Sequence, residues 1–201
     1  MALARAFADP VHGAQQTFRA VMNALARPGT LQPVDGLIEA PAPLSPVAAA
    51  IAVALADYET PLWLDDPLAA APDVAAWLAF HTGSRIIAAP SQAAFALVAD
   101  PAALPDLAGF ALGSDIYPDR STTLILQVAD FAANTATSRL RLEGPGIKGH
   151  ATLAVAGLPA DIVERLAANH ALFPRGVDLL LAGPSSVAAL PRTTRVTLVE
   201  T

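Results

Sequence analysis

The sequence predicts a layered α/β fold built around a mixed β-sheet. Patterns typical of helices and of strands alternate along the whole chain, and such alternation places helices on the faces of a sheet. Residues 122–128, TTLILQV, form an apolar run that suits a strand covered on both faces. A length of 201 residues, 54% of them hydrophobic, fits one domain over residues 1–201 with a substantial core.

The first helix is predicted at residues 10–26. Asp9 can cap its N-terminus, Pro10 suits its first turn, and the sequence Arg27-Pro28-Gly29 ends it. The helical spacing of apolar residues predicts a buried face made of Val11, Ala14, Phe18, Val21, Met22 and Leu25.

Three further helices are predicted at residues 46–57, 72–82 and 159–171. The helix at 46–57 is apolar on almost every side, which is typical of a helix packed between other elements. In the last helix we expect Asp161 and Arg165 to pair on the outer side. The proline-rich residues 33–46 leave room for only a short strand or a loop. The other strands are predicted at residues 60–64, 85–89, 95–98, 138–143, 151–156, 177–182 and 195–199.

Composition excludes several classes of protein. A net charge of −6 argues against general nucleic-acid binding, which requires a basic surface. The absence of cysteine excludes disulfides and a thiol nucleophile and fits a reducing cytoplasm. The longest aliphatic run, residues 47–56, is about half as long as the ~20 residues that a membrane-spanning helix needs, so we expect no membrane span. Residues 1–10 carry the charges of Arg5 and Asp9, so we expect no signal peptide. Few charges on so apolar a chain predict a partner-covered surface and a homodimer in isolation.

The glycine-rich residues 143–150, EGPGIKGH, are a candidate anion site. Backbone amides around Gly144 and Gly146, beside Lys148, could hold a phosphate, and Arg192 and Arg195 could contribute from the later PRTTR segment. A phosphate-binding loop of the Walker type needs a Ser or Thr after its lysine and then a helix, whereas here a glycine and a predicted strand follow. The alternatives are a tight turn between strands and, for the arginines, structural hydrogen bonds.

Other residues offer little chemistry. The four histidines lie far apart in the chain and lack the i, i+4 spacing of a helical metal pair. Asp65 and Asp66, before a proline, are read as a turn device and not as acid/base machinery. The chain has no Gly-x-Ser-x-Gly motif for a nucleophilic serine. The sequence therefore assigns no catalytic, cofactor-binding or metal-binding residue.

Several segments together resemble the PhnH family of carbon–phosphorus lyase subunits. They occur in the family's order and cover nearly the whole chain. The segments are Asp9-Pro10-Val11, Ala14-Gln15, Phe18-Arg19, Arg27-Pro28-Gly29, Leu55-Ala56-Asp57, Thr60-Pro61-Leu62-Trp63-Leu64, Phe80-His81-Thr82, Ala94-Phe95-Ala96, Thr123-Leu124-Ile125-Leu126-Gln127-Val128, Leu140-Arg141-Leu142, Gly146-Ile147, Phe173-Pro174, Gly176-Val177-Asp178-Leu179 and Pro191-Arg192-Thr193-Thr194.

The resemblance implies a subunit of a phosphonate-degrading core complex with PhnG, PhnI and PhnJ-type partners. That complex attaches a phosphonate to ribose triphosphate from ATP and then breaks the carbon–phosphorus bond, so it has transferase and lyase activities, which are attributed to the partner subunits. The implied fold is a three-layer sandwich similar to the large domain of pyridoxal-phosphate-dependent transferases but without their cofactor site. Lys148, the sole lysine, is the one residue that could form a Schiff base with such a cofactor, and it lies between glycines.

Two interpretations follow from these observations. In the first, the chain is a non-catalytic assembly subunit that needs no cofactor. In the alternative, it is a ligand-binding or catalytic subunit that itself holds a phosphonate or a nucleotide. The sequence contains no group of acidic and basic residues with the spacing of a known catalytic motif, and this favours the first interpretation.

Overall fold

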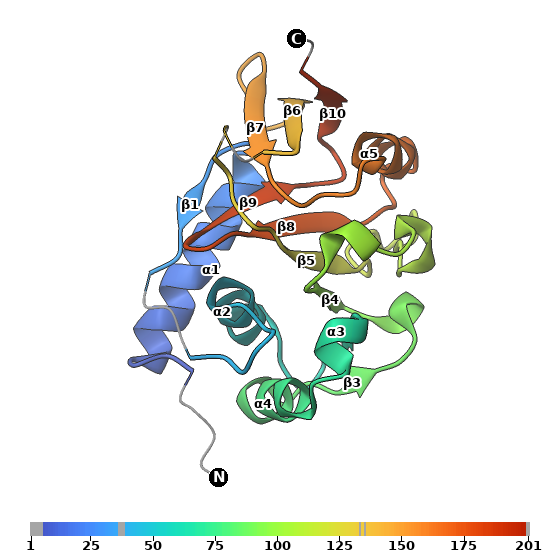
Figure 1. Ribbon diagram of the computed structural model, residues 1–201. Helices are drawn as coiled ribbons and strands as arrows, with labels where there is room; N and C mark the ends of the chain where they lie inside the picture. The colour runs from blue at the N-terminus through green and yellow to red at the C-terminus, as the bar shows by residue number, and fades with distance from the viewer. Residues whose placement is uncertain (1–5, 36–38, 133, 135, 200–201) are drawn as a thin grey trace.

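The computed structural model describes residues 6–35, 39–132, 134 and 136–199 (Figure 1). The first five residues, with Arg5, and part of the proline-rich segment lie outside the described residues. The α-helices are α1 (Pro10–Ala26), α2 (Pro46–Leu55), α3 (Asp66–Ala69), α4 (Pro72–Thr82) and α5 (Ile162–Ala171). The strands are β1 (Gln32–Pro33), β2 (Leu62–Leu64), β3 (Ile86–Ile87), β4 (Phe95–Val98), β5 (Thr123–Gln127), β6 (Ser138–Glu143), β7 (Ala151–Val155), β8 (Asp178–Ala182), β9 (Ser186–Leu190) and β10 (Arg195–Leu198).

A seven-stranded mixed sheet forms the middle of the molecule. Its strand order is β1-β9-β8-β5-β4-β2-β3, with parallel pairing from β8 to β3 and antiparallel pairing of β9 with both β8 and β1. Helices α1, α2 and α4 lie on one side of this sheet, and α5 lies on the other side with a small antiparallel sheet of order β10-β6-β7 (Figure 1). The predicted layered α/β fold with a mixed sheet is confirmed.

The centre of the sheet is the strand predicted from the TTLILQV run. Leu124, Ile125 and Leu126 of β5 are fully buried, although successive side chains of a strand point to opposite faces. Ile125 belongs to the hydrophobic cluster under the helices, and Leu124 and Leu126 belong to the cluster under the small sheet and α5. Two cores therefore share one strand, which explains why its apolar run is continuous and not alternating.

Helix α1 begins and ends as predicted, but only part of the predicted face is buried: Val21 is fully buried, and Ala14 and Leu25 pack against the core. The Asp9 carboxylate accepts hydrogen bonds from the backbone N–H groups of residues 11 and 12 and caps the helix. The buried residues of the helix are Thr17, Ala20, Val21 and Ala24, while Val11, Phe18 and Met22 are exposed. Helix α1 contacts α2 and β9, and a close approach to the alanine-rich α2 requires small side chains at the contact.

The remaining helices follow the sequence pattern closely. Helix α2 has six buried residues, as expected for a helix enclosed between other elements. Helix α4 ends at Gly83, whose φ of 72° is the left-handed conformation predicted for a helix stop. Helix α5 begins at Ile162 and not at residue 159, and the predicted pair of Asp161 and Arg165 is present at 2.9 Å.

The sequence analysis missed three elements. Strand β9 is rich in alanine, a residue with low strand propensity, and it follows a turn at residues 183–185. The one-turn helix α3 begins at the Asp65-Asp66 pair, for which the sequence predicts only a turn. Strand β1 is only two residues long and pairs with β9 at the edge of the sheet. Among the described residues, no helix is both long enough and apolar enough to cross a membrane.

Candidate functional site

The outer side of the small sheet carries a group of charged and hydroxyl side chains. In β6 the buried Leu140 and Leu142 alternate with Arg139 and Arg141, as the sequence pattern predicted. The same alternation in β7 and β10 turns polar side chains to the same side as the arginines. We call this surface the basic face and define it by Arg139, Arg141, Glu143, His150, Thr152, Arg195 and Thr197.

Strand register brings these residues together from three separate parts of the chain. Arg141 pairs with Thr152 of β7 on one side and with Thr197 of β10 on the other, so the three residues form one row across the sheet. Arg195 pairs with Glu143 in the neighbouring row. Because adjacent strands lie about 4.8 Å apart, the row of Thr152, Arg141 and Thr197 spans roughly 10 Å.

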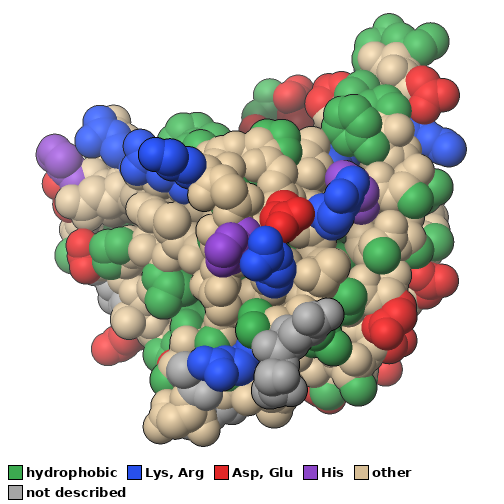
Figure 2. All heavy atoms as spheres, turned by 90° about the horizontal axis from the view of Figure 1, so that it is seen from above, with side chains coloured by type: hydrophobic (Ala, Val, Ile, Leu, Met, Phe, Trp, Pro, Cys, Tyr) green, Lys and Arg blue, Asp and Glu red, His purple; other side chains and the backbone are tan. Residues whose placement is uncertain are grey.

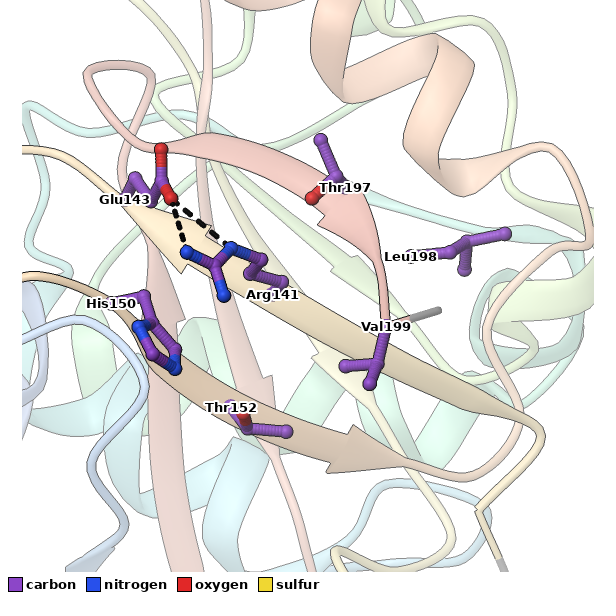
Figure 3. Close-up of a pocket in the computed structure, with 7 residues that line it drawn as sticks. All are labelled: Arg141, Glu143, His150, Thr152, Thr197, Leu198 and Val199. Atoms are coloured by element: carbon purple, nitrogen blue, oxygen red, sulfur yellow. Dashed lines mark hydrogen bonds and ion pairs between the residues drawn. The ribbon is translucent and has the colours of Figure 1, made fainter. Parts of the chain in front are cut away.

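An ion pair lies at the centre of the basic face. Nε and Nη2 of Arg141 donate hydrogen bonds to Oε1 of Glu143 at 3.1 and 2.8 Å (Figure 3). These bonds lower the pKa of the Glu143 carboxyl below its ordinary value, and the charges of Arg195 and His150 act in the same direction. The two side chains are 43% and 42% exposed, so solvent weakens the pair while its geometry still orients the guanidinium.

A cavity of about 560 Å³ opens over this ion pair. It is lined by Arg141, Glu143, His150, Thr152, Thr197, Leu198 and Val199 (Figure 3). Seen from the end of the molecule where the small sheet lies, basic side chains and histidines surround the acidic group in the middle of the surface (Figure 2). One arginine and one glutamate line this hollow. Arg139 and Arg195 lie on the same face around it, so the surroundings carry positive charge although the net charge of the chain is −6.

The structure separates the five residues predicted for an anion site. A methyl group at Gly144 would lie 2.9 Å from the Thr193 carbonyl oxygen, so the glycine loop does lie against the PRTTR segment. Gly146 instead faces the end of α1, and Lys148 is exposed in the loop. Arg195 belongs to the basic face. These positions bring Gly144 and Arg195 near one another but put Arg192 in a different setting.

Arg192 is held in a dense network at the start of strands β5 and β8. Its backbone N–H and Nε donate to Oδ1 of Asp178 at 2.8 and 3.1 Å, and its Nη2 donates to Asp178 and Ser121. Nη1 donates to the carbonyl oxygens of Pro118 and Pro174 at 2.9 and 3.4 Å. Each guanidinium nitrogen therefore has an acceptor in the fold, and an anion at Arg192 would have to displace one of them.

The cavity beside Arg192 is less suited to an anion than the basic face. It has a volume of about 350 Å³ and is lined by Pro118, Asp119, Phe173, Pro174, Asp178, Arg192 and Thr193. Two of these residues are carboxylates, and the Asp178 side chain is only 22% exposed and paired with Arg192. The network holds strand ends together, in agreement with the structural alternative given for this arginine.

The histidines have separate environments. His12 contacts the Asp9 carboxylate at 2.8 Å, and the ring of His81 lies 4.4 Å from that of Trp77. His170 contacts the Arg192 carbonyl oxygen at 2.8 Å, and His150 lies on the basic face. Within the described part of the chain, no three His, Asp or Glu side chains gather in a way that could hold a metal ion.

Asp65 caps the one-turn helix α3, where the sequence predicts only a turn. The carboxylate is buried and accepts backbone N–H groups from Leu68 at 3.3 Å, from Ala99 at 2.7 Å and from Asp100 at 3.0 Å. It thereby joins the end of β2 to the end of β4 and begins α3. The neighbouring Asp66 is exposed.

Sequence reasoning missed most of the basic face. Arg139, Arg141, Thr152 and Thr197 lie outside the predicted anion site. Glu143 and His150 were included only as the ends of the glycine-rich segment 143–150, and Arg195 is the one residue of the basic face that was singled out as a donor. The alternating charges of residues 138–143 were a usable signal, because they predicted a half-exposed strand. The pairing partners of that strand were not readable from one sequence.

Comparison with known proteins gives a consistent result. The sequence profile described as "Bacterial phosphonate metabolism protein (PhnH)" matches residues 5–197. A Rhizobium meliloti (strain 1021) protein described as alpha-D-ribose 1-methylphosphonate 5-triphosphate synthase subunit PhnH is 42% identical over 191 residues, which is 95% of this chain and 94% of the relative. A Stutzerimonas stutzeri protein described as the putative C-P lyase subunit protein HtxG is 31% identical over 189 residues, covering 92% of this chain and 86% of the relative. The chain therefore belongs to the PhnH family of bacterial phosphonate metabolism proteins.

Proposed function

We propose that this protein is a non-catalytic assembly subunit of a cytoplasmic carbon–phosphorus lyase complex. Both relatives are described as subunits, one of a ribose 1-methylphosphonate triphosphate synthase and one, putatively, of a C-P lyase. Under this proposal the chain, as a single domain over residues 1–201, binds subunits of the PhnG, PhnI and PhnJ types. In isolation it forms a homodimer.

The observation that carries the proposal is an apolar stripe on α1. Val11, Phe18 and Met22 are 63%, 47% and 38% exposed and occupy one side of the helix at helical spacing. The buried residues of α1, Thr17, Ala20, Val21 and Ala24, lie on the adjoining side of the helix. Large apolar side chains arranged in a row on an ordered helix favour association with another helix or sheet surface.

The polar network at Arg192 supports a structural role for this chain. The Arg192 guanidinium donates hydrogen bonds to Asp178, Ser121 and two backbone carbonyl groups. These bonds connect strands that begin far apart in the sequence. A catalytic group needs a free donor, acceptor or nucleophile at a substrate, whereas the donors of Arg192 are used for holding the fold together.

The stripe provides a direct test of the assembly role. We expect the double variant Phe18→Ser/Met22→Ser to remain folded, because both side chains are exposed, but to elute as a monomer and to co-purify poorly with the partner subunits. The matched control is Gln16→Ser/Asn23→Ser on another exposed side of α1, which should behave like the unmodified protein. Equal behaviour of the two double variants in light scattering and in co-purification would remove the stripe from the proposal.

The expected fold similarity to pyridoxal-phosphate-dependent transferases, without their cofactor, forms part of the same proposal. Lys148 would be the Schiff-base residue if a cofactor were used, and it is exposed in a loop. We expect no absorbance from a bound pyridoxyl group after incubation with pyridoxal phosphate and borohydride. We also expect Lys148→Ala to leave complex assembly and phosphonate-dependent growth intact. A folded, assembled Lys148→Ala protein that fails to support growth would contradict the non-catalytic role.

A further inference from the structure

We propose that the basic face binds the phosphate groups of a phosphorylated small molecule. This inference does not depend on the assembly role, since it concerns a ligand site on the opposite side of the small sheet from the core. It starts from charge: three arginines and one glutamate share this surface, and Lys148 lies in the adjoining loop, although the chain as a whole has a net charge of −6. Such a local reversal of charge attracts anions.

The donors of the basic face are already oriented. Glu143 accepts from two nitrogens of Arg141 and so fixes the plane of the guanidinium. The third nitrogen, Nη1, points away from Glu143 toward His150 and Thr152 (Figure 3). A planar guanidinium held in this way can donate to a phosphate oxygen with little loss of side-chain entropy.

Threonines lie on both sides of Arg141 in the sheet. Thr152 and Thr197 pair with Arg141 across the sheet and line the same cavity. Arg139 lies one strand repeat from Arg141 on the same face, at about 7 Å. Donors thus extend in two directions from Arg141, which suits an extended anion such as a polyphosphate chain better than a single small ion.

Glu143 limits where the anion can lie. Its carboxylate would repel a phosphate, so the ligand is expected on the Nη1 side, toward Thr152 and away from the Glu143 row. Val199 forms an apolar wall of the cavity there. A volume of about 560 Å³ is in the range of small-molecule sites, and an apolar wall beside the donors can contact the uncharged part of a phosphorylated ligand.

Calorimetric titration of the isolated protein at low ionic strength tests this proposal. The probes are inorganic tripolyphosphate, ATP and methylphosphonate, with polyglutamate as an anion of a different class. We expect tripolyphosphate and ATP to bind, and Arg141→Gln to weaken both about tenfold or more, because it removes charge-assisted hydrogen bonds. Thr152→Val, a nearly isosteric change, should weaken binding less while leaving the melting temperature unchanged.

Arg85→Gln is the matched control. Arg85 is an exposed arginine next to β3, at the end of the molecule remote from the small sheet (Figure 1). Its replacement should leave both affinities unchanged. The proposal would be overturned if neither phosphate probe bound, or if the Arg85 and Arg141 variants lost affinity equally. Binding of polyglutamate alone would also overturn it and would indicate an acidic protein partner instead. In an NMR titration with the same phosphate probes, chemical-shift changes confined to residues outside the basic face would also overturn the proposal.

Discussion

Gly146 offers the most direct test of the loop between β6 and β7. Its φ is +81°, and a methyl group there would lie 2.1 Å from the Ala26 carbonyl oxygen at the end of α1. Gly149, three residues on, has a φ of +75° but nothing within 4 Å of a methyl group. The two glycines therefore share a backbone conformation and differ only in what surrounds them.

The expected losses differ for this reason. A left-handed conformation costs a non-glycine residue about 1–2 kcal/mol, partly offset by the lower entropy of the unfolded alanine variant, so Gly149→Ala should lose about 1 kcal/mol. Gly146→Ala must in addition move the loop away from the Ala26 carbonyl, and overpacking of this kind costs about 1–3 kcal/mol more. The predicted total for Gly146→Ala is about 2–4 kcal/mol.

Thermal unfolding measures both variants. For a protein of this size, 1 kcal/mol corresponds to about 2–4 °C, so the melting temperature should fall by roughly 2–4 °C for Gly149→Ala and by roughly 4–16 °C for Gly146→Ala. Equal decreases in the melting temperatures of the two variants would show that the loop can move away from α1 without cost. That result would refute the close contact at Gly146 as the reason for its larger loss of stability. A Gly146→Ala protein that melts at the unmodified temperature would refute the positive φ as well.

Three further changes test the polar contacts. Asp65→Ala should lower the free energy of unfolding by about 2–4 kcal/mol, because it leaves the buried N–H group of Leu68 and the part-buried N–H groups of Ala99 and Asp100 without their acceptor. Replacement of the exposed neighbour, Asp66→Ala, should change it by less than about 0.5 kcal/mol, and equal denaturation midpoints for the two variants would contradict this. Asp178→Ala leaves the largely buried guanidinium of Arg192 without its carboxylate and should lower the free energy of unfolding by about 3 kcal/mol. An unchanged urea midpoint would show that this network does not stabilise the fold. Arg141→Gln should raise the pKa of Glu143 toward its ordinary value in an NMR titration. The ionised Glu143 carboxylate stabilises the fold above its unfolded-state pKa, and this stabilisation is lost as pH falls through the lower folded pKa. In the Arg141→Gln variant it should decrease, and an unmoved pKa would contradict the pairing.

Local signals in the sequence predicted the elements that depend on local chemistry. The Asp9 cap, the central strand β5 and the alternation of β6 all rest on patterns within one segment, and the structure confirms each of them. Strand β9 was missed because its alanines carry no strand signal of their own. Its place between β8 and β1 depends on tertiary pairing.

The buried face of α1 shows where periodicity stops being informative. Apolar spacing identified a stripe of large residues, but the fold buries the adjoining side, with Ala20 and Ala24, and leaves Phe18 and Met22 exposed. The choice depends on how closely α2 approaches, which a single segment does not encode. The basic face was missed for a related reason, since the register that joins Arg141 to Thr197 links residues distant in the chain.

Native mass spectrometry of the tagged chain, co-expressed with PhnG, PhnI and PhnJ-type subunits, tests the assembly role. We expect one assembly that contains this chain together with all three partners. The Phe18→Ser/Met22→Ser variant should be lost from this assembly, whereas the Gln16→Ser/Asn23→Ser control should remain in it. A tagged chain that is recovered without any of the three partners under the same conditions would contradict the role of this protein as an assembly subunit.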